Sequence, residues 1–257
     1  MNRAELIEGI ARLARDAGRE IMAVYATDFA VEGKADESPV TDADRRAERV
    51  IIKGLSVLTP GYPVIAEEQA AAGNIPQAGN LYWLVDPLDG TREFIKRNGE
   101  FTVNIGLIEA GKPVLGVVFA PALDQMYAGG SELGAWMETA GKRRAIASRA
   151  VPEAGLTVAA SRSHGDNTLL EAFLAGRVVA AQRIAGSSLK FCLIAAAEAD
   201  LYARFGRTME WDTAAGHAVL AAAGGSVTDV NGRELGYGKP GLENPHFVAW
   251  GRGPEPS

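Results

Sequence analysis

The first sixty residues carry apolar positions at helical spacing. Over residues 4–25 these positions recur three or four residues apart, which predicts an amphipathic helix with one buried face. They are Leu6, Ile10, Leu13, Ala17 and Ile21. A second helical stretch covers residues 41–58 and ends before a Pro-Gly pair. Thr41 and Asp44 have the spacing of a capping box, so we expect this helix to begin at Thr41.

The pattern then changes to that of β-strands. Short apolar runs at 63–68 and 82–86 predict two strands, and the first of them, PVIAEE, ends in two acids. Runs rich in Val and Ile at 101–108 and 114–119 flank the sequence EAGKP. This arrangement predicts a β-hairpin with its turn at EAGKP.

Strand and helix patterns alternate in the second half of the chain. Residues 140–153 are basic and less regular, so we place a soft domain boundary there. We expect an N-terminal α+β half over residues 1–145 and a C-terminal α/β half over residues 146–257. In the latter, LTVAASRSH, VVAAQRIAG, SVTDV and HFVAW predict strands, and NTLLEAFLAG, SSLKFCLIAAAEAD and DTAAGHAVLAAAGG predict helices. The alternation favours an α/β or layered α+β fold.

Composition excludes several classes of function. The chain has 257 residues, 47% of them hydrophobic, and a formal charge of −6, which argues against a general surface for a nucleic-acid polymer. The single cysteine, Cys192, cannot form an internal disulfide and fits a reducing compartment. No apolar run approaches the roughly 20 residues of a transmembrane segment, and the N-terminus lacks a signal-peptide pattern. We therefore expect a cytoplasmic protein.

Acids stand at the ends of apolar segments in four places. They are Asp42 with Asp44, Glu67 with Glu68, Asp86 with Asp89, and Asp212. Each alone has a plain structural explanation, as a helix cap or a solvated strand end. The pair Asp86 and Asp89 is harder to explain in this way, because WLVD predicts a buried strand end and a buried carboxylate needs a positive partner.

A cluster of such acids is typical of a site for a hard cation, because Mg²⁺ takes oxygen ligands and shares them with phosphate. The three histidines, His164, His217 and His246, lie far apart and lack ligand spacing for zinc. In PLDG, Pro87 fixes one φ angle and Gly90 can adopt conformations closed to other residues. We therefore expect a sharp turn after Asp86, with both aspartates and the Leu88 carbonyl facing one point.

The motifs AEE, WLVDPLDGTREF and WDTAAGHAVLAAAGG occur in that order. Together they resemble the inositol monophosphatase superfamily of Mg²⁺-dependent, lithium-sensitive phosphatases, over nearly the whole chain. The resemblance implies an αβαβα sandwich and two or three Mg²⁺ ions. It implies that the metal ligands are Glu67, Asp86, the Leu88 carbonyl, Asp89 and Asp212.

The resemblance also implies the catalytic residues. Glu67 would bridge metal and attacking water, and the Thr91 hydroxyl, paired with Asp44, would orient that water. Gly90 and Thr91 would offer backbone N–H groups to the phosphate at the start of a short helix. Glu68 and Asp42 do not match ligand positions. Cys192 lies in an apolar helical run that indicates a core position.

Within the superfamily, DGTREFIKRNGEFTVNIGLI is similar to the bisphosphate nucleotidase branch, the CysQ type. That branch removes the 3′-phosphate from adenosine 3′,5′-bisphosphate, so the implied partner is a small phosphorylated substrate. Such a substrate needs a second anion site without metal. The residues expected to contact substrate are Gly90, Thr91, Ser161, Arg162, His164, Gly186, Ser187, Ser188, Lys190 and Asp212. A capped helix at GSSLK and a polar loop at SRSH are the alternatives.

Other functions stay open at this point. An inositol-1-monophosphatase, or another sugar phosphatase of the superfamily, is the nearest alternative. Phe205 stands where inositol monophosphatases carry an acid that holds the inositol hydroxyls, which argues against inositol phosphate. Glu210, directly before Trp211, has no clear counterpart. A binding module without activity is disfavoured because the expected ligands and Thr91 are all present, and a structural role would leave the acids unexplained. A homodimer is compatible with the sequence.

Overall fold

A computed structural model describes residues 1–33, 39–161 and 167–253. Both predicted N-terminal helices are confirmed, as α1 (Arg3–Tyr25) and α2 (Asp42–Leu58). The capping box of α2 is present: the Asp44 carboxylate accepts bonds from the Thr41 amide at 2.8 Å and the Thr41 hydroxyl at 2.7 Å. Asp44 is fully buried, so the cap fixes its side chain at the start of α2.

A seven-stranded sheet follows in the chain, with its strands side by side in sequence order. Its strands are β3 (Val64–Ala66), β4 (Leu81–Asp89), β5 (Thr102–Glu109), β6 (Lys112–Ala120), β7 (Gln125–Gly130), β8 (Gly134–Thr139) and β9 (Lys142–Ile146). The pair β3 and β4 is parallel, and every other neighbouring pair is antiparallel. The predicted hairpin is confirmed as β5–β6, with Ala110 and Gly111 at positive φ in its turn.

This half contains one strand that the sequence did not predict and one turn that was predicted wrongly. The basic stretch after residue 140 is ordered as β9, the edge strand of the sheet, and four of its five residues are exposed, so no buried face marked it in the sequence. The strand β4 does not end at Asp86 in a sharp turn. It continues to Asp89 through a bulge, because Asp86 lies opposite Asn104 whereas Asp89 lies opposite Thr102.

The second sheet has five strands in the order β11-β10-β12-β14-β13. They are β10 (Leu156–Ala160), β11 (Val179–Ile184), β12 (Leu201–Arg204), β13 (Ser226–Asp229) and β14 (Phe247–Trp250). Four of them match predicted strands, and β12, only four residues long, was not foreseen. The predicted helices are confirmed as α5 (Asn167–Leu174), α6 (Leu189–Ala195) and α7 (Glu210–Ala222).

The short elements complete the chain. They are β1 (Glu32–Gly33), β2 (Pro39–Val40), α3 (Glu67–Ala71), α4 (Thr91–Ile95) and η1 (Pro240–Leu242). The pair Glu67 and Glu68 therefore begins a helix, α3, where the sequence favoured the end of a strand.

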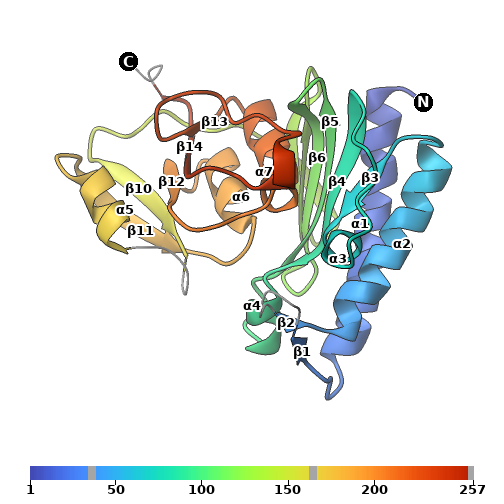
Figure 1. Ribbon diagram of the computed structural model, residues 1–257. Coiled ribbons are helices and arrows are strands. Elements are labelled where there is room, and N and C mark those ends of the chain that lie inside the picture. Colours follow the sequence, from blue (N-terminus) through green and yellow to red (C-terminus); the bar gives the residue numbers. More distant parts are fainter. Residues whose placement is uncertain (34–38, 162–166, 254–257) are drawn as a thin grey trace.

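The elements stack in five layers, as the expected αβαβα sandwich requires (Figure 1). Helices α1 and α2 cover one face of the first sheet, and α6 and α7 lie between the two sheets. On the outer face of the second sheet, Phe173 and Leu174 of α5 pack on a cluster that includes Val158 and Val248.

Glycines allow α7 to approach the first sheet closely. A Cβ atom on Gly116 of β6 would lie 2.3 Å from the Ala215 carbonyl oxygen, and one on Gly106 of β5 would lie 2.9 Å from the Ala214 Cβ. The small residues of the sequence DTAAGHAV are thus explained by backbone contact with the sheet. The approach positions the first turn of α7, which carries Asp212.

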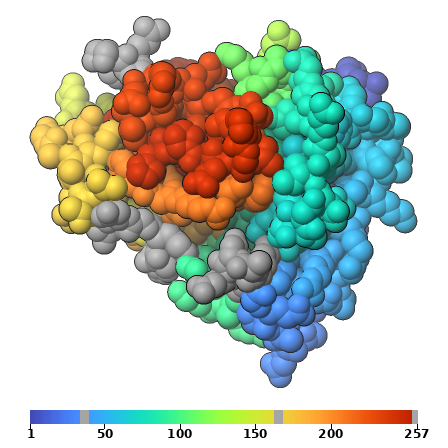
Figure 2. Space-filling view, in the orientation of Figure 1, coloured from blue at the N-terminus to red at the C-terminus, as the bar shows by residue number. Residues whose placement is uncertain are grey.

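The C-terminal residues also pack on the edge of the first sheet. Figure 2 shows them, in red, against the teal segment that contains β3 and β4. The buried cluster between them includes Ile65, Leu84, Trp211, Tyr237 and Leu242. Within residues 1–33, 39–161 and 167–253, no helix combines the length and the apolarity needed to cross a bilayer.

Candidate active site

The predicted acids come together from three elements. Asp86 and Asp89 lie at the end of β4, and Glu67 follows the parallel strand β3, so these acids share one edge of the sheet. Asp212 is in the first turn of α7, where its carboxylate accepts the Met209 N–H at 2.8 Å.

Glu67 and Asp89 are close enough to both Asp86 and Asp212 to affect the pKa of these two acids. Burial raises the pKa of Asp86 well above its usual value, and the charges of Glu67, Asp89 and Asp212 raise it further. Burial is also the main cause of the raised pKa of Asp212, followed by the charges of Asp89 and Glu67. Buried carboxylates in this arrangement repel one another unless a cation or protons neutralise them.

The donor set fits a hard divalent cation by its chemistry, since it consists of carboxylate oxygens on converging elements. The side chains as they stand do not enclose an ion: in the described ranges no three His, Cys, Asp or Glu residues are arranged to hold one. Instead a hydrogen bond joins Glu67 to Asp86 and contributes to the raised pKa of Asp86. Binding a metal would therefore replace this hydrogen bond.

Thr91 and Asp44 have the expected contact. The Thr91 hydroxyl lies 3.2 Å from Asp44 Oδ1 and 3.3 Å from the Leu88 carbonyl oxygen, so its single proton has two acceptors. Gly90, at φ 90°, immediately precedes α4, and Thr91 is the first residue of that helix. Gly90 thus adopts a left-handed conformation that other residues rarely adopt, which agrees with the freedom expected of a glycine here.

The residues expected at the second anion site have mostly protein partners. The Gly186 N–H donates to Glu100 Oε2 at 3.0 Å, and the Ser187 hydroxyl lies 2.8 Å from the carbonyl oxygens of Asp89 and Glu100. The Ser188 N–H and hydroxyl contact Asp89 Oδ2 at 2.7 and 2.9 Å. The serines therefore contact residues 86–91, which we call the metal loop because the sequence predicts metal ligands there. They do not cap α6, which begins without a side-chain cap.

Lys190 and Ser161 line the cavity next to these serines. The Lys190 ammonium donates to the carbonyls of Ser187 and Ala185 at 2.7 and 3.2 Å, and burial lowers its pKa to about 8. Arg162 and His164 lie outside the described residues.

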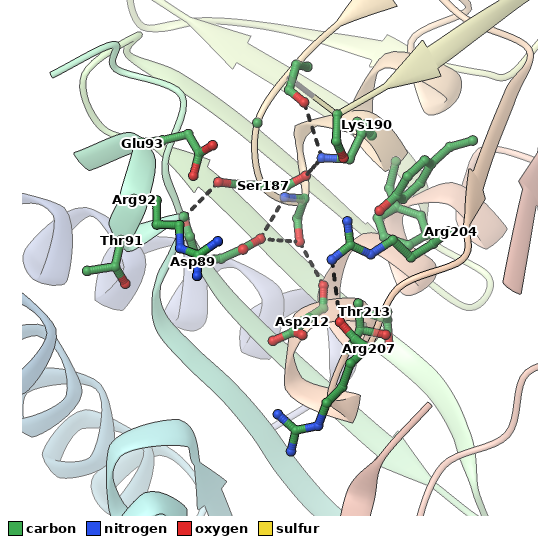
Figure 3. Close-up of a pocket in the computed structure, with 18 of the residues that line it drawn as sticks. Asp89, Thr91, Arg92, Glu93, Ser187, Lys190, Arg204, Arg207, Asp212 and Thr213 are labelled. Carbon is green, nitrogen blue, oxygen red and sulfur yellow. Dashed lines mark hydrogen bonds between the residues drawn. The ribbon is translucent and has the colours of Figure 1, made fainter. Parts of the chain in front are cut away.

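A cavity of about 320 Å³ contains Asp89, Thr91 and Asp212 in its wall. The cavity also exposes three arginines that sequence reasoning missed, Arg92, Arg204 and Arg207. Figure 3 shows Thr91 on one side of Asp89, with Lys190 and Arg204 on the other. The Arg204 Nε is buried and has no hydrogen-bond partner among the described residues, whereas its Nη2 donates to the Arg207 carbonyl at 3.4 Å. Arg92 lies in the motif DGTREF, and the signal for Arg204 and Arg207 was the sequence RFGRT before Trp211.

Glu210 and Phe205 make contacts that hold other parts of the chain in place. Glu210 is fully buried and accepts the backbone N–H groups of Gly238 and Lys239, both at 2.9 Å, away from the cavity wall. Phe205 packs on Phe173 and His246, with ring centroids 5.9 and 5.7 Å apart.

Two further acids and the single cysteine remain to be placed. Asp42 pairs with Arg46 at the surface, and the amide of Glu68 donates to Glu48. Cys192 is buried, as expected of a core residue, and burial raises the pKa of its thiol well above the usual value.

Comparison with known proteins agrees with this architecture. The model of the inositol monophosphatase family matches residues 2–251. A 3′(2′),5′-bisphosphate nucleotidase CysQ of Salmonella typhimurium is 52% identical over 235 residues, which cover 90% of this chain and 94% of that protein. A CysQ of Buchnera aphidicola is 46% identical and covers 91% and 88%.

Solved structures give the same result. The crystal structure of CysQ from Bacteroides thetaiotaomicron has a TM-score of 0.78 and 35% identity, over 94% of this chain and 97% of that one. An IMPase of Thermotoga maritima has a TM-score of 0.79 and 28% identity, over 98% and 93%. The chain belongs to the inositol monophosphatase family.

Proposed function

We propose that the chain is a Mg²⁺-dependent 3′(2′),5′-bisphosphate nucleotidase that removes the 3′-phosphate of adenosine 3′,5′-bisphosphate. The observation that carries the proposal is one cavity with two kinds of wall. Asp89 and Asp212 give it an acidic side, whereas Lys190 and Arg204, together in Figure 3, give it a basic one. Its volume of about 320 Å³ lies within the range of small-molecule sites, about 300–1,000 Å³.

The two walls match a substrate with two phosphates. One phosphate would lie over the acids, where a cation bridges the like charges. The other would lie at the basic wall without metal, and Arg204, whose buried Nε has no hydrogen-bond partner among the described residues, is suited to receive it. An inositol monophosphate has no second phosphate for this wall. The names of the CysQ relatives support the same substrate class.

We assign the metal to Glu67, Asp86, the Leu88 carbonyl, Asp89 and Asp212. Bound Mg²⁺ would neutralise these carboxylates, lower the pKa of the attacking water and stabilise charge on the leaving oxygen. Burial and the neighbouring carboxylates raise the pKa of Asp86 and of Asp212, which supports the assignment, because a neutralising cation would let both ionise.

The chain's own residues orient the attack. The Thr91 hydroxyl donates to Asp44 or Leu88, so its lone pairs can accept a hydrogen bond from water. Asp44, fixed by the α2 cap, keeps that hydroxyl in place. The backbone N–H groups of Gly90 and Thr91, at the start of α4, would bind the phosphate under attack. Catalysis then comes mainly from positioning and charge stabilisation.

Steady-state kinetics on purified protein test the proposal. We expect kcat/KM for adenosine 3′,5′-bisphosphate to exceed that for inositol 1-phosphate at least about tenfold, a difference of about 1.4 kcal/mol. EDTA should abolish both activities and Mg²⁺ should restore them. Higher kcat/KM for inositol 1-phosphate would favour the inositol monophosphatase alternative, and full activity in EDTA would contradict the metal site. The count of two or three ions, a homodimer and a cytoplasmic location stay predictions.

A further inference from the structure

We infer that Asn104 and Ser188 form a clamp that holds the Asp89 carboxylate in the orientation required for metal binding. We call these two residues the Asp89 clamp. The inference rests on the proposed metal-dependent function and gives Ser188 a different role from substrate contact. Both members are positioning residues, because they contact a metal ligand rather than the reacting atoms.

The hydrogen bonds to the Asp89 carboxylate are one-sided. Oδ2 receives the Ser188 N–H at 2.7 Å, the Ser188 hydroxyl at 2.9 Å and the Asn104 Nδ2 at 3.2 Å. No donor from the described part of the chain reaches Oδ1. Because these donors occupy Oδ2, the other oxygen is left to bind a cation. Hydrogen-bond partners commonly orient metal ligands in this way.

The clamp is itself rigid. Asn104 and Ser188 are 0% and 2% exposed, and the Asn104 amide also donates to the Ser188 hydroxyl at 2.9 Å. The Thr102 hydroxyl lies 3.0 Å from the Asn104 carbonyl oxygen and 3.5 Å from Asp89 Oδ2, so its single proton favours the amide and holds its second end. Asn104 lies on β5 opposite Asp86, which places the clamp directly behind the metal loop.

The clamp connects the end of β4, which carries Asp89, with the first turn of α7, which carries Asp212. The Ser188 hydroxyl lies 2.9 Å from Asp89 Oδ2 and also 2.9 Å from the Asp212 carbonyl oxygen. Beside it, the Ser187 hydroxyl would lie only 2.2 Å from a Cβ on Gly90, so the serine turn is docked tightly onto the metal loop. This hydroxyl, whose single proton can go to either acceptor, thus lies between the Asp89 carboxylate and the Asp212 backbone, which are 123 residues apart in sequence.

Manganese binding to the full chain, measured by calorimetry without substrate, tests the clamp. Ser188→Ala should weaken Mn²⁺ binding about 10- to 100-fold, the usual effect of removing a partner of a metal ligand. Ser188→Thr, which keeps the hydroxyl, should bind within a few-fold of the wild type. Ser148→Ala is the matched control, because it removes another buried hydroxyl, bonded to the Ala223 carbonyl at 3.0 Å, outside the cavity wall.

A second variant covers the case in which Ser188→Ala does not fold. Asn104→Ala removes the side-chain donor to Asp89 and should also weaken Mn²⁺ binding at least about tenfold. If the wild type and Ser188→Ala bind Mn²⁺ equally, the clamp is wrong. A rise in KM for adenosine 3′,5′-bisphosphate alone would then show that Ser188 contacts substrate. Wild-type protein that binds no Mn²⁺ would overturn the metal-dependent function and the clamp together.

Discussion

Asp89 is the residue on which the proposed chemistry depends most, because it lines the cavity and its carboxylate also accepts the Ser188 N–H. Asp89→Asn should lower kcat at least about 100-fold, since it removes a charge that would hold the cation in the transition state. The fold should survive, because the amide keeps the shape of the carboxylate. Phosphate release with saturating Mg²⁺ measures the effect, and circular dichroism checks the fold.

The surface residue Asp42 provides the control for this substitution. It is paired with Arg46 and exposed, so Asp42→Asn should leave turnover unchanged. Wild-type turnover by Asp89→Asn on adenosine 3′,5′-bisphosphate would show that the metal ligands have been assigned wrongly.

Arg204 should determine affinity for the second phosphate. Arg204→Ala should raise KM for adenosine 3′,5′-bisphosphate about tenfold or more, the effect of losing one charge-assisted hydrogen bond. For inositol 1-phosphate, which lacks a second phosphate, KM should change little. Arg19→Ala, at an exposed pair with Asp16, is the control. An equal rise in KM for both substrates would mean that Arg204 binds the phosphate under attack.

Single residues also show what the sequence could predict about the site. Asp86 and Asp89 were identified because a fully apolar run ends on them, and Thr91 with Asp44 followed from the family motif. The partner of Ser188 could not be predicted, because Asp89 is 99 residues away and a local pattern favours an ordinary helix start. Arg204 was missed because β12 is too short to show which side of a strand it faces.

At the scale of elements, the contact between α7 and the first sheet controls where Asp212 lies. Gly116→Ala should destabilise the protein by about 1–3 kcal/mol, because its Cβ would collide with the backbone of Ala215. Urea unfolding measures the change. Gly33→Ala has no atom within 4 Å of the added Cβ and should change stability by less than about 0.5 kcal/mol. Equal effects of the two substitutions would contradict a close approach of α7.

Elements in which apolar residues recur at regular spacing were predicted well, and elements without such spacing were not. Helices α1 and α2 and the β5–β6 hairpin have a buried face or a defined turn, so the spacing of apolar residues located them. The edge strand β9 buries only Ile146, and the rest of it is exposed and mostly charged. The bulge in β4 could not be read either, because Pro87 and Gly90 are equally compatible with a turn.

The whole molecule is a sandwich of two sheets around α6 and α7, and this arrangement came from the family resemblance rather than from the pattern. Alternation of strands and helices predicted a layered fold. It could not give the order β11-β10-β12-β14-β13, in which β14 lies between β12 and β13. Contacts between distant segments decide such an order.

The stability of the whole molecule should depend on a buried histidine. Burial lowers the pKa of His217 to about 4 from 6.5, against a smaller opposing effect of Glu234, while Lys112 and Lys239 lower it further. Between pH 6.5 and 4 the unfolded chain therefore binds a proton that the folded chain does not. Stability should fall as the pH falls through this window, by up to about 3 kcal/mol from this group.

The comparison with His217→Gln isolates this effect from the other acids. The variant keeps a partner for the Tyr237 hydroxyl, which lies 3.0 Å from His217 Nδ1, but it has no proton to gain. Urea unfolding at pH 7 and pH 4.5 should show a smaller loss of stability in the variant than in the wild type. An identical loss in both proteins would mean that His217 is accessible to protons in the folded state.

The central claim is that acids from separate parts of the chain meet because divalent cations neutralise them. Anomalous scattering from a crystal soaked in Mn²⁺ tests it most directly. We expect at least one strong peak surrounded by oxygens of Glu67, Asp86, Asp89 and Asp212. Wild-type crystals that diffract well, contain Mn²⁺ in the soak and show no peak among these four side chains would contradict the account.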